Sequence, residues 1–180
     1  KKEHIGLSPY EIHFKGEKKS EKVILEVIDY DSENLDEFIA KDLNEVVKFN
    51  KTATTTWLNI YGLHDLKIMG EIATQFELDP IILADVMNTH ARPKIQEYDN
   101  CIYISFKMLQ YDEKRNYISS ENIVIIIKEH ILLLFQETGR CVKPYLLVGM
   151  PCSNRMDLFC LAANPVLPTT PFFLLFDSFE

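Results

Sequence analysis

The stretch ENIVIIIKEHILLLFQE (residues 121–137) contains two apolar runs separated by the polar triplet Lys128-Glu129-His130. A short polar break between two apolar runs is typical of a turn between antiparallel strands. The run Ile123–Ile127 is apolar at every position, whereas a strand with one solvated face alternates polar and apolar residues. The sequence therefore predicts a hairpin whose first strand lies inside a sheet and is covered on both faces.

The residues before this hairpin extend it to three strands. NCIYISFKMLQY (residues 100–111) alternates apolar and polar residues, and DEKRN (residues 112–116) has the composition of a turn. We therefore predict an antiparallel meander of Cys101–Tyr111, Glu121–Lys128 and Ile131–Gln136.

Three further strands are predicted nearer the N-terminus. The segments Pro9–Gly16 and Glu21–Tyr30 carry apolar residues at strand spacing, and the second has them on both faces. TTTWLNIYG (residues 54–62) is rich in residues that favour strands and stops at Gly62.

Four helices are predicted between these strands. Asp31 or Ser32 is a candidate cap for residues 33–40 (ENLDEFIA), and Asp42 is a candidate cap for residues 42–49 (DLNEVVKF). LHDLKIMGEIATQFE (residues 63–77) has apolar residues at helical spacing, namely Leu66, Met69, Ile72, Ala73 and Phe76.

The fourth helix has the clearest start signal, with Asp79 as its cap and Pro80 at its first position. It must end near Asn88 or Ala91, because Arg92 precedes a proline, which disfavours helical backbone. Strands at both ends of the region with helices between them predict an α/β domain with a mixed, partly antiparallel sheet.

The chain changes character after Gly139, so we predict a domain at residues 1–139 and an atypical Pro/Cys-rich apolar tail at residues 140–180. Residues 141–180 contain five of the eight prolines and three of the four cysteines. No residue from Leu158 to Phe176 is charged, but the prolines there favour an extended tail over a membrane-spanning helix. We hypothesise a frame error or an aberrant end as the origin of this tail.

Composition and motifs argue against several classes of function. A net charge of −8 disfavours nucleic-acid binding, which needs clustered Lys and Arg, so no nucleic-acid partner is expected. The N-terminus lacks the apolar core of a signal peptide. There is no GxSxG turn and no glycine-rich phosphate loop, and Cys101 lies in a strand pattern where a buried, inert thiol is usual. We therefore predict that the protein is not an enzyme.

Oxygen ligands are the best candidates for a metal site, since the histidines and cysteines show none of the usual ligand spacings. Asp85 and Asn88 are three residues apart on one predicted helix and can project from the same face. Mg²⁺ takes carboxylate and amide oxygens and often keeps several waters. The pair makes half a site, with the rest supplied by a partner surface. The alternative reading is a solvated acidic helix face.

The motif Arg92-Pro93-Lys94 follows this helix and admits two readings. Its basic side chains have the charge to bind an anion, or they pair with nearby carboxylates such as Glu97 while the proline stiffens the turn.

Three segments together resemble the cytosolic N-terminal domain of CorA-type magnesium and cobalt transporters. They are TTTWLNIYGLHD, FELDPIILADVMNTHARPKIQEYDNCIYISFKML and ENIVIIIKEHILLLFQE. The resemblance runs from roughly Glu21 to Gly139, and its most specific block extends from Asp79-Pro80 to Tyr98. It implies a three-layer α/β/α sandwich on the cytoplasmic face of the cell (inner) membrane.

The resemblance also implies partners and a ligand. The full-length protein would be a homopentamer that meets the membrane only through C-terminal helices missing from this chain, while the fragment itself is soluble. Mg²⁺ or Co²⁺ would bind weakly between protomers and regulate the pore, with Asp85 at the position of the family's acidic ligand. Ala84 stands where the family usually has glutamate. The alternative is a purely structural assembly collar of a divalent-cation transporter, Zn²⁺ included, with no ion site of its own.

Overall fold

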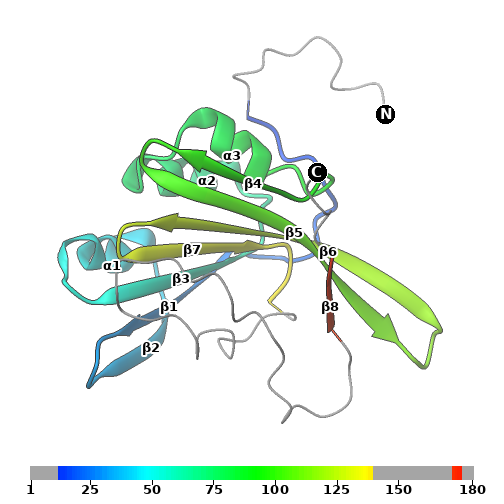
Figure 1. The fold of residues 1–180 in the computed structure, drawn as a ribbon, viewed down its shortest axis with the longest axis horizontal. Helices are drawn as coiled ribbons and strands as arrows, with labels where there is room; N and C mark the ends of the chain where they lie inside the picture. The colour runs from blue at the N-terminus through cyan, green and yellow to red at the C-terminus, as the bar shows by residue number, and fades with distance from the viewer. Residues whose placement is uncertain (1–11, 140–171, 176–180) are drawn as a thin grey trace.

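A mixed β-sheet forms the centre of the structure, a computed structural model that describes residues 12–139 and 172–175 (Figure 1). The strand order is β2-β1-β3-β7-β6-β5-β4, and β8 pairs with β5 outside this path. Among the described strands, β3 and β7 pair in parallel and the other pairs are antiparallel. The strands are β1 (Ile24–Tyr30), β2 (Leu35–Ala40), β3 (Thr55–Tyr61), β4 (Lys94–Tyr98), β5 (Cys101–Asp112), β6 (Tyr117–Lys128), β7 (Ile131–Gln136) and β8 (Phe172–Leu175). The predicted α/β class with a mixed sheet is confirmed.

The meander β5-β6-β7 is as predicted, except that β6 begins at Tyr117, earlier than the expected Glu121. Its second turn places Glu129 in the left-handed region, with φ 50°, so that β7 returns directly alongside β6. β6 lies between β7 and β5, and its residues Glu121–Ile126 are buried on both faces of the sheet. Val124 and Ile126 pack with the helices, while Ile123 and Ile125 pack on the opposite face. The unbroken apolar run therefore marks an interior strand, as expected.

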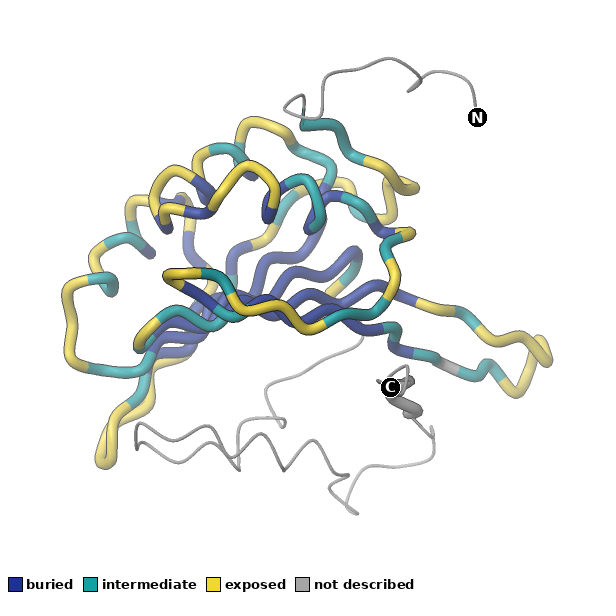
Figure 2. The backbone as a smooth tube through the Cα atoms, turned by 45° about the horizontal axis from the view of Figure 1, so that its top comes forward, coloured by how far each residue is buried: buried dark blue, intermediate teal, exposed yellow. Residues whose placement is uncertain are grey.

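The described helices α1 (Leu43–Val47), α2 (Leu66–Gln75) and α3 (Pro80–Val86) cover one face of the sheet (Figures 1 and 2). A short 3₁₀ helix, η1 (Lys48–Lys51), continues α1. An aspartate side chain accepts backbone N–H groups at the start of each α-helix, and the three caps are Asp42, Asp65 and Asp79. Met69 and Ile72 of α2 are fully buried, but Leu66, the first residue of the helix and a member of the predicted apolar pattern, is 51% exposed.

A second apolar cluster lies on the opposite face and consists of strand residues. Its largest member is Trp57, packed with residues of β5, β6 and β7. The described helices account for one of the two helical layers implied by the family resemblance, and the second layer stays a prediction.

The predicted helix at residues 33–40 is wrong, because this segment forms strand β2. Asp31 Oδ1 accepts the N–H groups of Glu33 and Asn34, each at 2.8 Å, and closes a turn that brings β2 back along β1. An aspartate can stabilise a turn and a helix start with the same kind of hydrogen bond. Pairing with β1 decided between the two, and sequence periodicity could not.

The structure differs from the prediction at two other segments. Residues 12–16, the described part of the predicted strand Pro9–Gly16, form one isolated bridge between Lys15 and Asn88 and no strand. Strand β4 was not predicted, because Lys94–Tyr98 holds only two apolar or aromatic positions at the sheet edge, and these give a weak pattern.

The predicted tail is described only at β8, where it is extended and pairs with Lys107–Gln110 of β5. The other predictions for residues 140–171 and 176–180 lie outside the described residues, and the boundary at residue 139 stays a prediction. Within the described part of the chain, no helix has both the length and the apolar character needed to cross a bilayer.

Candidate functional site

Asp85 lies in the last turn of α3, and its carboxylate is held by a basic side chain of the same chain. Ile82, Leu83 and Val86 of this helix are buried against the sheet, which leaves the Asp85 side chain at the edge of the core, 30% exposed. Asp85 Oδ2 accepts a hydrogen bond from Lys94 Nζ at 2.6 Å. The predicted metal ligand is therefore partly exposed and already neutralised by an ion pair.

Lys94 reaches this carboxylate from the first residue of β4. Its Nζ also donates to Gln96 Oε1 at 3.1 Å and lies 5.0 Å from the centre of the Tyr103 ring. Tyr103 is fully buried in β5, so it gives the ammonium group a fixed aromatic surface. Of the two readings of the Arg92-Pro93-Lys94 motif, pairing with a carboxylate is the one observed for Lys94, and the partner is Asp85, whereas Glu97 was the expected one.

Asn88 lies beyond the end of α3, because this helix stops at Val86, earlier than predicted. The helical spacing assumed for Asp85 and Asn88 therefore does not apply. Asn88 Oδ1 accepts the backbone N–H of His90 at 3.3 Å, and the Asn88 N–H donates to the carbonyl of Asp85 at 3.1 Å. These contacts shape the exit from the helix. The roles of Asp85 and Asn88 as metal ligands stay proposals.

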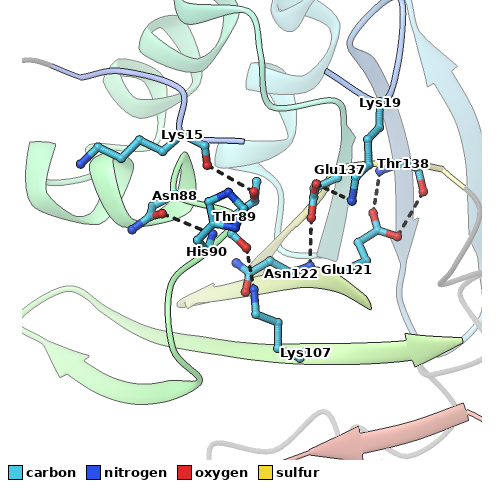
Figure 3. A network of polar contacts seen from close by, with 10 residues as sticks. All are labelled: Lys15, Lys19, Asn88, Thr89, His90, Lys107, Glu121, Asn122, Glu137 and Thr138. Atoms are coloured by element: carbon cyan, nitrogen blue, oxygen red, sulfur yellow. Dashed lines mark hydrogen bonds and ion pairs between the residues drawn. The ribbon is translucent and has the colours of Figure 1, made fainter. Parts of the chain in front are cut away.

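The connection after α3 is held by hydrogen bonds to two other segments of the chain, as Figure 3 shows. The Lys15 carbonyl accepts the Thr89 N–H at 3.0 Å, and Lys107 Nζ donates to the Thr89 carbonyl at 2.5 Å. These two bonds hold Thr89 in the connection that follows Asp85. In residues 12–139 and 172–175, no three His, Cys, Asp or Glu side chains cluster closely enough to hold a metal ion.

Comparison with known proteins identifies a family that this chain resembles. A family model described as a CorA-like Mg²⁺ transporter protein matches residues 52–140, which include α3 and β4. The "Cobalt/magnesium transport protein CorA" of Thermotoga maritima is 33% identical over 132 residues. This chain belongs to the CorA-like family. The alignment covers 73% of this chain and 37% of that relative, so the chain spans well under half of the relative's length.

Two solved structures were also found for comparison with this CorA-like chain. The complete CorA magnesium transporter from Methanocaldococcus jannaschii gives a TM-score of 0.45 at 14% identity, covering 63% of this chain and 32% of that one. The soluble domain of CorA from the same organism gives 0.43 at 14% identity, covering 60% and 39%.

The CorA-like region also contains two buried carboxylates that sequence reasoning missed, Glu121 and Glu137. The β6–β7 pairing stops at Ile123 and Gln136. Beyond it, Glu137 Oε1 accepts the Asn122 N–H at 3.1 Å, and Glu121 Oε1 accepts the Thr138 N–H at 2.6 Å (Figure 3). The two side chains thus replace the backbone acceptors of the next ladder positions. Counting outward from the predicted turn would have placed Asn122 opposite Glu137 and Glu121 opposite Thr138.

Two lysines, Lys19 and Lys107, lie at the end of the sheet that holds Glu121 and Glu137. Lys19 Nζ lies 2.8 Å from Glu137 Oε2, and the Glu137 side chain is only 4% exposed. Lys107 is opposite Asn122 in the β5–β6 register, and burial lowers its pKa, while the charge of Glu137 raises it. This network is structural in character, because each carboxylate is engaged with backbone N–H groups of a strand end.

A further polar cluster lies on the sheet face opposite the helices. Trp57 Nε1 donates to Asn59 Oδ1, and Asn59 Nδ2 and Tyr61 Oη both donate to Glu26 Oε2. Burial raises the pKa of the Tyr61 phenol, and its hydrogen bond to the Glu26 carboxylate raises it further. The fold therefore favours the neutral phenol.

This shift in the pKa of Tyr61 predicts a loss of stability at alkaline pH. Because the pKa is raised in the folded state, its contribution is complete below the unfolded value of about 10 and is lost as the pH rises beyond that value. We expect the free energy of unfolding, measured with urea, to fall as the pH rises above about 10 and to fall less steeply in Tyr61→Phe. An equal slope in both proteins would contradict this assignment.

Proposed function

We propose that this chain is the cytosolic regulatory domain of a CorA-type transporter for Mg²⁺ or Co²⁺. In this proposal the full-length protein is a homopentamer at the cytoplasmic face of the cell membrane, and Asp85 helps to bind a regulatory Mg²⁺ between neighbouring protomers. The observation that carries the proposal is the family match over residues 52–140. This range includes Asp85 in α3 and its partner Lys94 in β4.

The physical argument concerns charge at a subunit boundary. One partly exposed carboxylate supplies too few ligands for a hard cation that needs six oxygens, although Mg²⁺ keeps several of its waters. Asp85 groups brought together by assembly would repel one another, and a divalent ion between them would neutralise that repulsion. Binding is therefore weak and coupled to association, and loss of the ion favours separation of the protomers.

Titration with Mg²⁺ tests this role of Asp85. We expect calorimetry and sedimentation velocity to detect weak Mg²⁺ binding and Mg²⁺-dependent association of the wild-type chain at millimolar concentrations. Asp85→Ala should weaken the binding by on the order of tenfold or more, because it removes the charged ligand. Asp36→Ala, which removes an exposed carboxylate of β2, is the matched control and should leave binding unchanged. Identical titrations of wild type and Asp85→Ala would contradict the proposal.

An assembly collar without an ion site is the second candidate, for a divalent-cation transporter that includes Zn²⁺ among its possible cargoes. Two observations favour it: Ala84 supplies no carboxylate, and the charge of Asp85 is already balanced by Lys94 at 2.6 Å. In this case the protein would associate equally well with and without Mg²⁺. The same sedimentation experiment separates the two candidates.

A further inference from the structure

We propose that Lys94 is a tethered counter-ion that competes with Mg²⁺ for Asp85 and thereby sets the Mg²⁺ concentration to which this domain responds. The inference rests on the proposed function of Asp85 and adds a second residue, from a different element, that determines its affinity.

The first support is the position of the ammonium group. Lys94 Nζ lies 2.6 Å from Asp85 Oδ2, so it occupies a coordination position of that oxygen. A magnesium ion bound to the same oxygen would lie about 2 Å from it, within a few ångströms of the ammonium group. Two cations so close repel strongly in a partly buried site. Mg²⁺ and Lys94 therefore exclude one another at Asp85 Oδ2.

The second support is the rigid attachment of Lys94. Its backbone N–H donates to Ser105 Oγ at 3.1 Å, and Ser105 Oγ in turn donates to the Arg92 carbonyl at 3.2 Å. Lys94 also pairs with Ser105 in the β4–β5 register, and Ser105 is 1% exposed. The backbone is thus held in place, and only the lysine side chain has to move when Asp85 is released.

The third support is that Lys94 has other partners when it leaves Asp85. Gln96 Oε1 at 3.1 Å and the Tyr103 ring at 5.0 Å both lie within reach of its Nζ. When Lys94 releases the Asp85 carboxylate, its ammonium group therefore still has the Gln96 oxygen and the Tyr103 ring as partners. A competitor of this kind lowers the affinity of Asp85 for Mg²⁺ but does not prevent Mg²⁺ from binding.

The size of the effect follows from the strength of the ion pair. Both side chains are about one-third exposed, at 34% for Lys94 and 30% for Asp85, so solvent screens the pair. The apparent affinity for Mg²⁺ is the intrinsic affinity reduced by the fraction of molecules in which Asp85 is free. Removing the ammonium group should therefore raise the affinity about two- to fivefold.

Calorimetric titration of the full 180-residue chain with magnesium chloride tests the proposal. We expect Lys94→Met to bind Mg²⁺ about two- to fivefold more tightly than wild type, and Lys94→Arg, which keeps the charge, to bind like wild type. Lys67→Met is the matched control: it removes the same charge from α2, where Lys67 is 86% exposed and pairs only loosely with Glu71 at 3.9 Å. The affinity of Lys67→Met for Mg²⁺ should equal that of wild type.

The outcomes separate this inference from the proposed function. If Asp85→Asn weakens Mg²⁺ binding but Lys94→Met binds no more tightly than Lys67→Met, the counter-ion role is overturned and the ion site stands. If wild type does not bind, or if Asp85→Asn binds like wild type, both proposals fail. Weaker binding by Lys94→Met would show that Lys94 supports the site, and that also overturns the inference. If thermal melting shows that Lys94→Met is unfolded, Lys94→Gln takes its place with the same expected gain.

Discussion

Glu137→Ala should lower the free energy of unfolding by about 2–4 kcal/mol, since it leaves buried partners unsatisfied. The Glu137 side chain is 4% exposed and holds two groups at once, the Asn122 N–H at 3.1 Å and Lys19 Nζ at 2.8 Å. Truncation would leave that N–H buried without an acceptor at the point where the β6–β7 pairing stops. Urea unfolding followed by the fluorescence of Trp57, which the second apolar cluster surrounds, measures the change.

Two further variants identify the origin of this loss. Glu137→Gln keeps an oxygen acceptor for the Asn122 N–H and removes the charge that faces Lys19, so it should cost less than Glu137→Ala. Glu71→Ala removes a half-exposed carboxylate from α2 and should change the stability by less than about 0.5 kcal/mol. Equal effects of Glu137→Ala and Glu71→Ala would show that the network at the strand end contributes nothing to stability.

Gly62→Ala should also destabilise the protein by about 2–4 kcal/mol, because this position has no room for a side chain. Gly62 follows β3 with φ +89°, a backbone conformation that residues with a Cβ rarely adopt. An added Cβ would clash with Ser20 Oγ and lie 3.2 Å from the carbonyl oxygen of Lys22. The backbone has little freedom to move away, since the Gly62 N–H donates to the Gln136 carbonyl at 2.9 Å.

Gly70→Ala provides the matched control for this substitution. Gly70 lies inside α2, and an added Cβ would meet no atom within 4 Å. Alanine favours the helix more than glycine does, so this variant should gain about 0.5–1 kcal/mol. Urea unfolding of both variants compares the two effects, and a loss of stability in Gly70→Ala would contradict the open surroundings seen at that position.

Comparison of β6 with β2 shows how far the sequence could predict the fold. The apolar run Ile123–Ile127 leaves few alternatives, because a strand that is apolar on both faces must be covered on both. Residues 33–40 contain a cap signal and an irregular apolar pattern that suit a helix and a hairpin alike. The deciding factor was the neighbouring strand β1, with which β2 pairs from Leu35 to Ala40.

At the candidate site, too, one feature could be predicted from the sequence and another could not. Asp85 was singled out from its helix and from the family resemblance, and the structure places it at the edge of the core in α3, as expected for a helix with Asp79 as its cap. Its pairing with Lys94 was not predicted, because the expected partner of that lysine was the neighbouring Glu97. Strand β4 had not been recognised, so nothing in the pattern brought Lys94 back to α3.

The sequence by itself determined the elements whose signals are local and strong: the β5-β6-β7 meander, the helix caps Asp42 and Asp79 and the stop at Gly62. These depend on side-chain periodicity and on backbone preferences, which act over a few residues. Only the tertiary structure decided the strand fate of β2, the Asp85–Lys94 pair and the carboxylates that close the end of β6 and β7. Each of these needs partners from separate elements, and their contact depends on strand register and helix ends, which are set by packing of the whole sheet.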